Sequence, residues 1–94
     1  MINIFQKTAP EINIDIAKRM VAIRKRRKIS QKELAKRSGV SLGSLKRFEQ
    51  TGEISLLSLT KISIALELDE EMENLFITLR NAETLDVAAE IREE

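Results

Sequence analysis

Residues 30–50, SQKELAKRSGVSLGSLKRFEQ, predict two short helices joined by a tight turn. Ser30 is followed three residues later by a glutamate, which is the pattern of a capping box at the start of a helix. Gly39 is suited to the left-handed conformation that commonly ends a helix. We therefore predict helices over about Gln31–Ser38 and about Leu42–Gln50, and the rest of the chain is expected to hold this pair in place or join it to a partner.

The apolar residues of this stretch predict which faces of the two helices are buried. Ala35 is small, as a residue must be where another helix crosses closely above it. The inward positions are Leu34, Ala35, Val40, Leu45 and Phe48. The start and the outer face of the second helix are left to Leu42, Gly43, Ser44, Lys46 and Arg47.

A longer helix is predicted before this pair. Thr8 is suited to cap it, Pro10 is tolerated in a first turn, and the helix is expected to reach about Arg27. Its apolar face has steps of 4, 4 and 3 residues and consists of Ile12, Ile16, Met20 and Ile23. Residues 1–7 form either a frayed terminus or a short strand, which would need a partner chain.

Five cations, RKRRK at residues 24–28, close this first helix. Cations suit the negative end of a helix dipole, so one interpretation is a solvated helix end. The other is a patch that contacts phosphates. The two interpretations are compatible, and we expect at most two or three of the five side chains to reach phosphates.

Two further helices are predicted after the pair. Ser55 caps the first of them, whose buried stripe is Leu56, Leu59, Ile62, Ala65 and Leu66. Leu57 and Ile64 lie outside that stripe and indicate a partner surface, although a more deeply sandwiched helix would also explain them. Asp69 is expected to cap a short last helix. The apolar face of that helix is Met72, Leu75, Phe76 and Leu79.

The length of 94 residues, with three Gly and one Pro, predicts a single, mainly helical domain over residues 1–94. Its core is expected to span residues 9–79, preceded by an arm over residues 1–8. Residues 80–94 form a tail that either packs back on the domain or becomes ordered with a partner.

Charge is distributed very unevenly along the chain. Residues 1–50 hold 13 Lys and Arg against 4 Asp and Glu, which gives +9. Residues 51–94 hold 3 against 11, which gives −8 and leaves a net charge of +1. A basic half suits a polyanion such as nucleic acid, and the acidic half is expected to point away from it.

The residue types present argue against catalysis. The chain has no His, Cys, Tyr or Trp, and no cofactor or metal motif is visible, so we predict neither an enzyme nor a cofactor. No apolar run is long enough to span a membrane and no signal peptide pattern opens the chain. A soluble cytoplasmic protein is expected.

Residues 30–50 also resemble a known family. Gln31, Ala35, Gly39, Val40, Leu45 and Phe48 stand at the spacing of the helix-turn-helix shared by phage repressors and Cro-like, XRE-type regulators. The resemblance extends from about Ile16 to Leu68. It implies an all-α, lambda-repressor-like fold of five helices with a short C-terminal extension, in which the third helix enters the DNA major groove.

The resemblance also implies roles for individual residues. Arg24 and Glu49 stand where the family pairs an arginine late in its first helix with a glutamate late in its third. Arg47 is the residue best able to fork onto a guanine. The implied DNA contacts are Gln31, Ser41, Leu42, Gly43, Ser44, Lys46 and Arg47. In the family the last helix commonly builds the two-fold dimer interface, so Met72 and Phe76 join Leu57 and Ile64 in the expected dimer or partner interface.

The sequence departs from the phage members at Leu42 and Gly43, where two glutamines often open the recognition helix. Leu42 can touch a thymine methyl but cannot donate a hydrogen bond. Gly43 either lets the backbone approach DNA closely or is merely tolerated. Base readout is thus thinner than usual, which favours binding through phosphates and DNA shape.

We therefore predict a transcriptional repressor that binds a palindromic operator in double-stranded DNA as a homodimer. A more specific hypothesis is an antitoxin, because the stretch 44–49, SLKRFE, and the pair Leu75-Phe76 are similar to HipB-like regulators that accompany HipA-type toxin kinases. The rival hypothesis is a protein-interaction module that has kept the fold without binding DNA.

Overall fold

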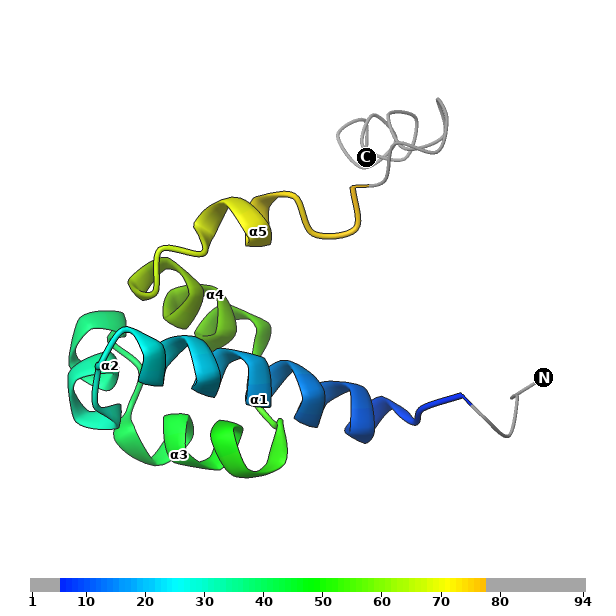
Figure 1. Cartoon of the computed structure of the whole chain (residues 1–94), viewed down its shortest axis with the longest axis horizontal. Coiled ribbons are helices and arrows are strands. Elements are labelled where there is room, and N and C mark those ends of the chain that lie inside the picture. Colours follow the sequence, from blue (N-terminus) through cyan, green and yellow to red (C-terminus); the bar gives the residue numbers. More distant parts are fainter. Residues whose placement is uncertain (1–5, 78–94) are drawn as a thin grey trace.

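The computed structural model describes residues 6–77, which form five helices and no strand. These are α1 (Ala9–Arg26), α2 (Gln31–Ser38), α3 (Leu42–Thr51), α4 (Leu56–Ala65) and α5 (Asp69–Glu73). The predicted all-α class with five helices is confirmed. Figure 1 shows α1 crossing the middle of the molecule, with α3 along one side and α4 followed by α5 on the other.

Four of these helices are capped at their N-termini by hydroxyl side chains. Thr8 and Glu11 form a complete capping box, in which each side chain accepts the backbone N–H of the other residue. The hydroxyls of Ser30, Ser41 and Ser55 each accept a backbone N–H three residues later. The box predicted at Ser30 is half formed, because the Glu33 carboxylate accepts from Arg37 instead, at 3.0 Å.

The core lies where α1, α2, α3 and α4 meet. Its buried apolar residues are Ala17, Met20, Leu34, Ala35, Val40, Leu45, Phe48, Ile62 and Leu66. Two residues assigned to buried stripes are exposed instead: Ile12 retains 46% and Leu56 69% of its accessible surface. The first turns of α1 extend past the end of α3 (Figure 1), and Leu56 borders an open recess at the start of α4, so neither residue is covered by a neighbouring helix.

The last helix differs from its prediction. Asp69 is the first residue of α5 rather than its cap, and no side chain caps this helix. The helix ends at Glu73, beyond which the chain tightens into turns and Phe76 adopts a left-handed φ of 66°. Leu75 and Phe76 therefore follow the helix instead of forming its face. Leu79, the end of the predicted core, the tail over 80–94 and most of the N-terminal arm lie outside the described residues.

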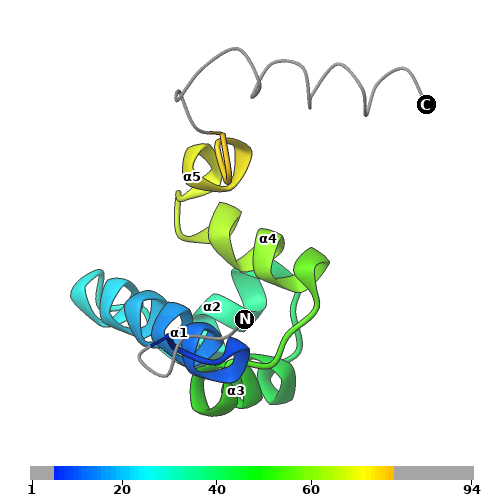
Figure 2. The same ribbon diagram turned by 90° about the vertical axis from the view of Figure 1, so that its right-hand side faces the viewer.

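The acidic residues of α5 lie far from α3. Figures 1 and 2 both show α4 between α5 and the rest of the bundle, with α3 on the opposite side. The carboxylates of Asp69, Glu70, Glu71 and Glu73 are exposed there. Within the described part of the chain, this places the acidic end of the molecule away from the predicted reading helix, as expected.

Candidate nucleic-acid interface

The orientation of α3 is fixed by its inner face. Leu45 and Phe48 are almost completely buried, with 1% and 2% of their surface exposed. The helix ends at Gly52, whose φ of 79° is left-handed. A Cβ at Gly52 would lie 2.7 Å from the backbone carbon of Asn13 in α1, so the end of α3 approaches α1 more closely than any other residue type allows.

The turn between α2 and α3 sets the angle of the pair. Gly39 has a φ of 75° and donates its N–H to the carbonyl of Ala35, while Val40 is buried at the corner. The Ser41 hydroxyl accepts the N–H of Ser44 and donates to the Ser44 hydroxyl at 2.9 Å. Ser41 and Ser44 are therefore engaged with each other at the start of α3, and both remain exposed.

A buried ion pair ties α3 to the end of α1. Arg24 donates from Nε to Glu49 Oε2 at 2.8 Å and from Nη2 to Oε1 at 3.0 Å, in a bidentate geometry. A third Arg24 bond reaches the carbonyl of Ile29 at 2.9 Å. Both charged side chains are only 9% exposed. The structure thus brings together the arginine and glutamate that the family resemblance paired.

Gln31 belongs to the same buried cluster. Its Nε2 donates to Glu49 Oε1 at 2.8 Å, which consumes one of its two amide hydrogens. The other hydrogen remains able to donate to a phosphate oxygen, because the side chain is only half-buried. Sequence reasoning gave Gln31 a DNA role and missed this link to Glu49.

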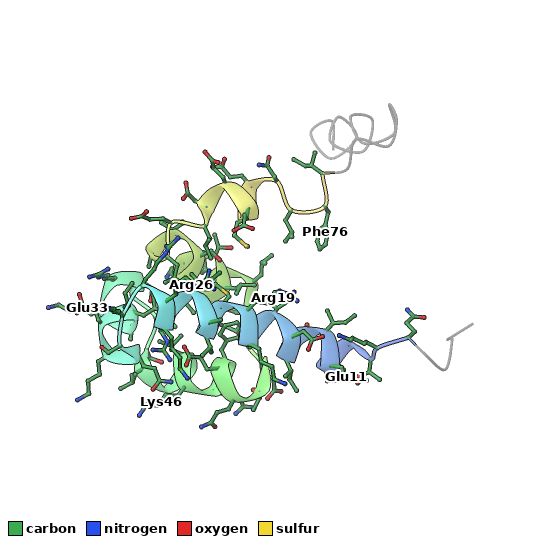
Figure 3. All side chains as sticks on the ribbon, in the orientation of Figure 1. Glu11, Arg19, Arg26, Glu33, Lys46 and Phe76 are labelled. Carbon is green, nitrogen blue, oxygen red and sulfur yellow. The ribbon has the colours of Figure 1, made fainter. Side chains whose placement is uncertain are left out.

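The outer face of α3 carries the remaining predicted readers. Gly43, Lys46 and Arg47 are exposed, and Figure 3 shows Lys46 projecting from α3 away from the other helices. Leu42 is half-buried and packs against the core. Arg47 donates from Nη2 to Glu53 at 2.9 Å. Sequence reasoning did not find Glu53, because a spacing of six residues across a turn carries no helical signal.

The run of cations at residues 24–28 has two parts. Arg24 is buried in its ion pair, whereas Lys25, Arg26, Arg27 and Lys28 are exposed around the end of α1. Lys28 has a left-handed φ of 58° and directs the chain into α2. One of the five residues is therefore structural, and four are available to a polyanion.

The predicted partner residues lie on α4, on α5 and just after α5. Leu57 and Ile64 are exposed on α4, and Phe76 is 88% exposed, with its ring clear of the helices (Figure 3). Met72 is half-buried and borders a largely apolar recess of about 290 Å³ between α1, α4 and α5. The other apolar residues of this recess are Ile16, Met20, Ile23, Leu59, Leu68 and Leu75.

Two other kinds of feature are absent from residues 6–77. In that range no cluster of three or more His, Cys, Asp or Glu side chains is arranged to hold a metal ion. No helix there is both long and apolar enough to cross a membrane.

The chain matches a known protein family. The helix-turn-helix family model matches residues 20–71, which is more than half of the chain and includes α2, α3, α4 and the first turn of α5. Searches of curated proteins and of solved structures gave no significant match. With its two-helix unit, left-handed glycine turn and exposed outer face of α3, the chain belongs to the XRE-type helix-turn-helix family of DNA-binding regulators.

Proposed function

We propose that this protein is a transcriptional repressor that acts in the cytoplasm, binding a palindromic operator as a homodimer with α3 of each copy in the major groove. The observation that carries the proposal is the division of α3 into two faces. Leu45 and Phe48 fix the inner face to the core, while Lys46 and Arg47 are exposed on the outer face. A rigid helix with an exposed cationic face is what major-groove reading requires.

Charge supports the same orientation. The exposed cations at residues 25–28 lie around the end of α1, and the half-buried Gln31 begins α2 with one amide hydrogen left to donate. Both are suited to phosphate contacts on either side of a groove. Because the acidic α5 lies on the opposite side of the molecule (Figure 2), it does not oppose the approach of DNA to α3.

Exposed apolar residues support the homodimer. Leu57, Ile64 and Phe76 would each leave water if a second copy covered α4 and the segment after α5. A two-fold interface uses the same patch on both copies, and the two α3 helices would then read half-sites about one turn of DNA apart. Occupation of a promoter by such a dimer would repress transcription.

The test is a binding titration on the DNA upstream of the protein's own gene, with scrambled DNA for comparison. Specific binding is expected to weaken steeply as salt rises, because bound cations are released from phosphates. Arg47→Ala should weaken the free energy of binding to the specific site by about 1–3 kcal/mol and relax the base preference at one position of that site. Arg37→Ala, which removes an exposed arginine from α2, is the matched control. Failure to bind this DNA would favour an interaction module instead.

The oligomeric state is tested separately by sedimentation. Phe76→Ser and Leu57→Ser remove side chains that contribute little to the folded monomer, since both are largely exposed. Each is expected to shift the protein toward monomer, whereas Ile12→Ser, at an exposed position on α1, should not. A wild-type protein that sediments as a monomer at high concentration would contradict the dimer.

An antitoxin role is the second candidate. The exposed Leu57 and Phe76 and the acidic surface of α5 together offer more partner surface than DNA binding requires. Such a protein would repress its own operon and neutralise a toxin encoded beside it. Co-purification with the neighbouring gene product would support this role, and the absence of a neighbouring toxin gene would count against it.

A further inference from the structure

An ion pair stands at the outer edge of α3, within the proposed reading surface. Arg47 Nη2 lies 2.9 Å from Glu53 Oε2, and the two side chains are 67% and 62% exposed. Ion pairs as exposed as this one contribute little to folding stability. A stabilising role therefore does not account for a carboxylate next to an arginine that is proposed to read DNA.

The turn after α3 holds the backbone of Glu53 in place. The Thr51 hydroxyl donates to the carbonyl of Arg47 at 2.7 Å, and the N–H of Glu53 donates to the Thr51 hydroxyl at 3.1 Å. Gly52, between them, is buried and packed against the backbone of α1. Two hydrogen bonds and a tight contact thus fix the point from which the Glu53 carboxylate reaches Arg47.

The space around the pair is open. Arg47 and Glu53 border a recess of about 310 Å³ between α3 and the start of α4. Its other lining residues are Ser44, Ile54, Ser55 and Ser58. Without the carboxylate, the long arginine side chain could turn into this recess or toward a neighbouring phosphate. The Glu53 contact therefore restricts a side chain that its surroundings leave free.

We propose that Glu53 is a specificity-determining residue, which positions the Arg47 guanidinium for base reading; this rests on the proposed placement of α3 in the major groove. A guanidinium carries five N–H donors, and the bond to Glu53 uses one on Nη2, so a two-pronged contact with a guanine remains available. The negative charge also weakens the attraction of this site for phosphates. Both effects favour the correct base over non-specific DNA.

The test uses selection from a randomised double-stranded DNA library by the full-length protein, followed by titration of the selected site and of a scrambled site. Glu53→Gln keeps the size of the side chain and removes its charge. The preference for the base read by Arg47 is expected to fall by up to about fivefold, the most that an exposed ion pair can contribute. Scrambled DNA should bind about two- to fivefold more tightly, as expected for one exposed charge. Glu73→Gln, on the far side of the molecule, is the charge-matched control and should leave the base preference unchanged.

A double variant with Glu53→Gln and Arg47→Ala distinguishes positioning of Arg47 from a general effect of the Glu53 charge on DNA binding. If Glu53 acts through Arg47, adding Glu53→Gln to Arg47→Ala should not change base preference further. An unchanged preference in Glu53→Gln, or an equal change with and without Arg47, overturns the inference while the proposed function stands. A wild-type protein that selects no sequence from the library overturns both.

Discussion

Removal of Arg24 is the most direct test of how the reading helix is held. Arg24→Ala deletes both bonds to the Glu49 carboxylate and the bond to the Ile29 carbonyl. The carboxylate, which is 9% exposed, keeps only the Gln31 amide as a partner. Breaking a buried ion pair by removing one partner costs about 3–5 kcal/mol, because the remaining charge is left uncompensated. That is a large share of the roughly 5–15 kcal/mol that stabilises a typical domain.

The measurement is urea or thermal unfolding followed by circular dichroism. For a domain of this size, each kcal/mol lowers the melting temperature by about 4–8 °C, so Arg24→Ala should melt at least about 12 °C below the wild type. The double variant Arg24→Met/Glu49→Leu removes both charges and is expected to recover most of the loss. Arg37→Ala breaks the exposed pair with Glu33 and should cost no more than about 0.5 kcal/mol.

The comparison among these variants tests whether the buried ion pair holds α3 in place. If Arg24→Ala costs no more than Arg37→Ala, the buried pair does not hold α3 in place. If the double variant remains as unstable as Arg24→Ala, the loss comes from packing of the arginine stem and not from an uncompensated carboxylate. Either result would refute the conclusion that a compensated buried charge joins α3 to α1.

Three further outcomes are expected. Gly52→Ala should lower the free energy of unfolding by about 2–5 kcal/mol, because the new Cβ would lie 2.7 Å from the α1 backbone and the residue keeps a left-handed φ of 79°. Gly39→Ala has the same kind of backbone, at φ 75°, but open space around it, so it should lower the free energy of unfolding by only about 1–2 kcal/mol in the same unfolding assay. Gly43→Ala has open space and should stabilise α3 by about 0.5–1 kcal/mol; weaker DNA binding by this stabilised variant would indicate that the backbone approaches DNA there. Hydrogen bonds from Thr8 hold the pKa of Glu11 below its ordinary value of 4.5, so the stability they provide is present above pH 4.5 and lost as pH falls through the lowered pKa. An NMR titration of the Glu11 carboxyl should show that lowered pKa, and Glu11→Gln should flatten the acid side of the stability profile.

Features that depend on a few neighbouring residues were predictable from the sequence. Ser41 caps α3 because its hydroxyl needs only an N–H three residues away. Gly39 ends α2 for an equally local reason, since it alone tolerates the left-handed φ at no cost. Arg24 and Glu49 are 25 residues apart, so only the family resemblance could pair them.

The failures have a common physical cause. Periodicity identifies the apolar face of a helix but not where a neighbouring helix stops covering it, which is why Ile12 and Leu56 are exposed. The same limit applies at α5, where Leu75 and Phe76 continue the apolar pattern although the helix has already ended. The Arg47–Glu53 pair depends on the path of the turn after α3, which no repeating pattern encodes.

Some side chains of α3 hold the helix in the fold, and others are exposed for contact with DNA. Glu49 is committed to Arg24, and the half-buried Leu42 packs partly against the core. Arg47 is shared with Glu53, and the other exposed polar side chains of α3 are Ser44, Lys46, Gln50 and Thr51. Since Leu42 and Gly43 cannot donate side-chain hydrogen bonds to bases, we expect phosphates and DNA shape to supply much of the binding energy. If Arg47 reads a base as we propose, selectivity depends on how closely its guanidinium is held, and Glu53 is the side chain that contacts it.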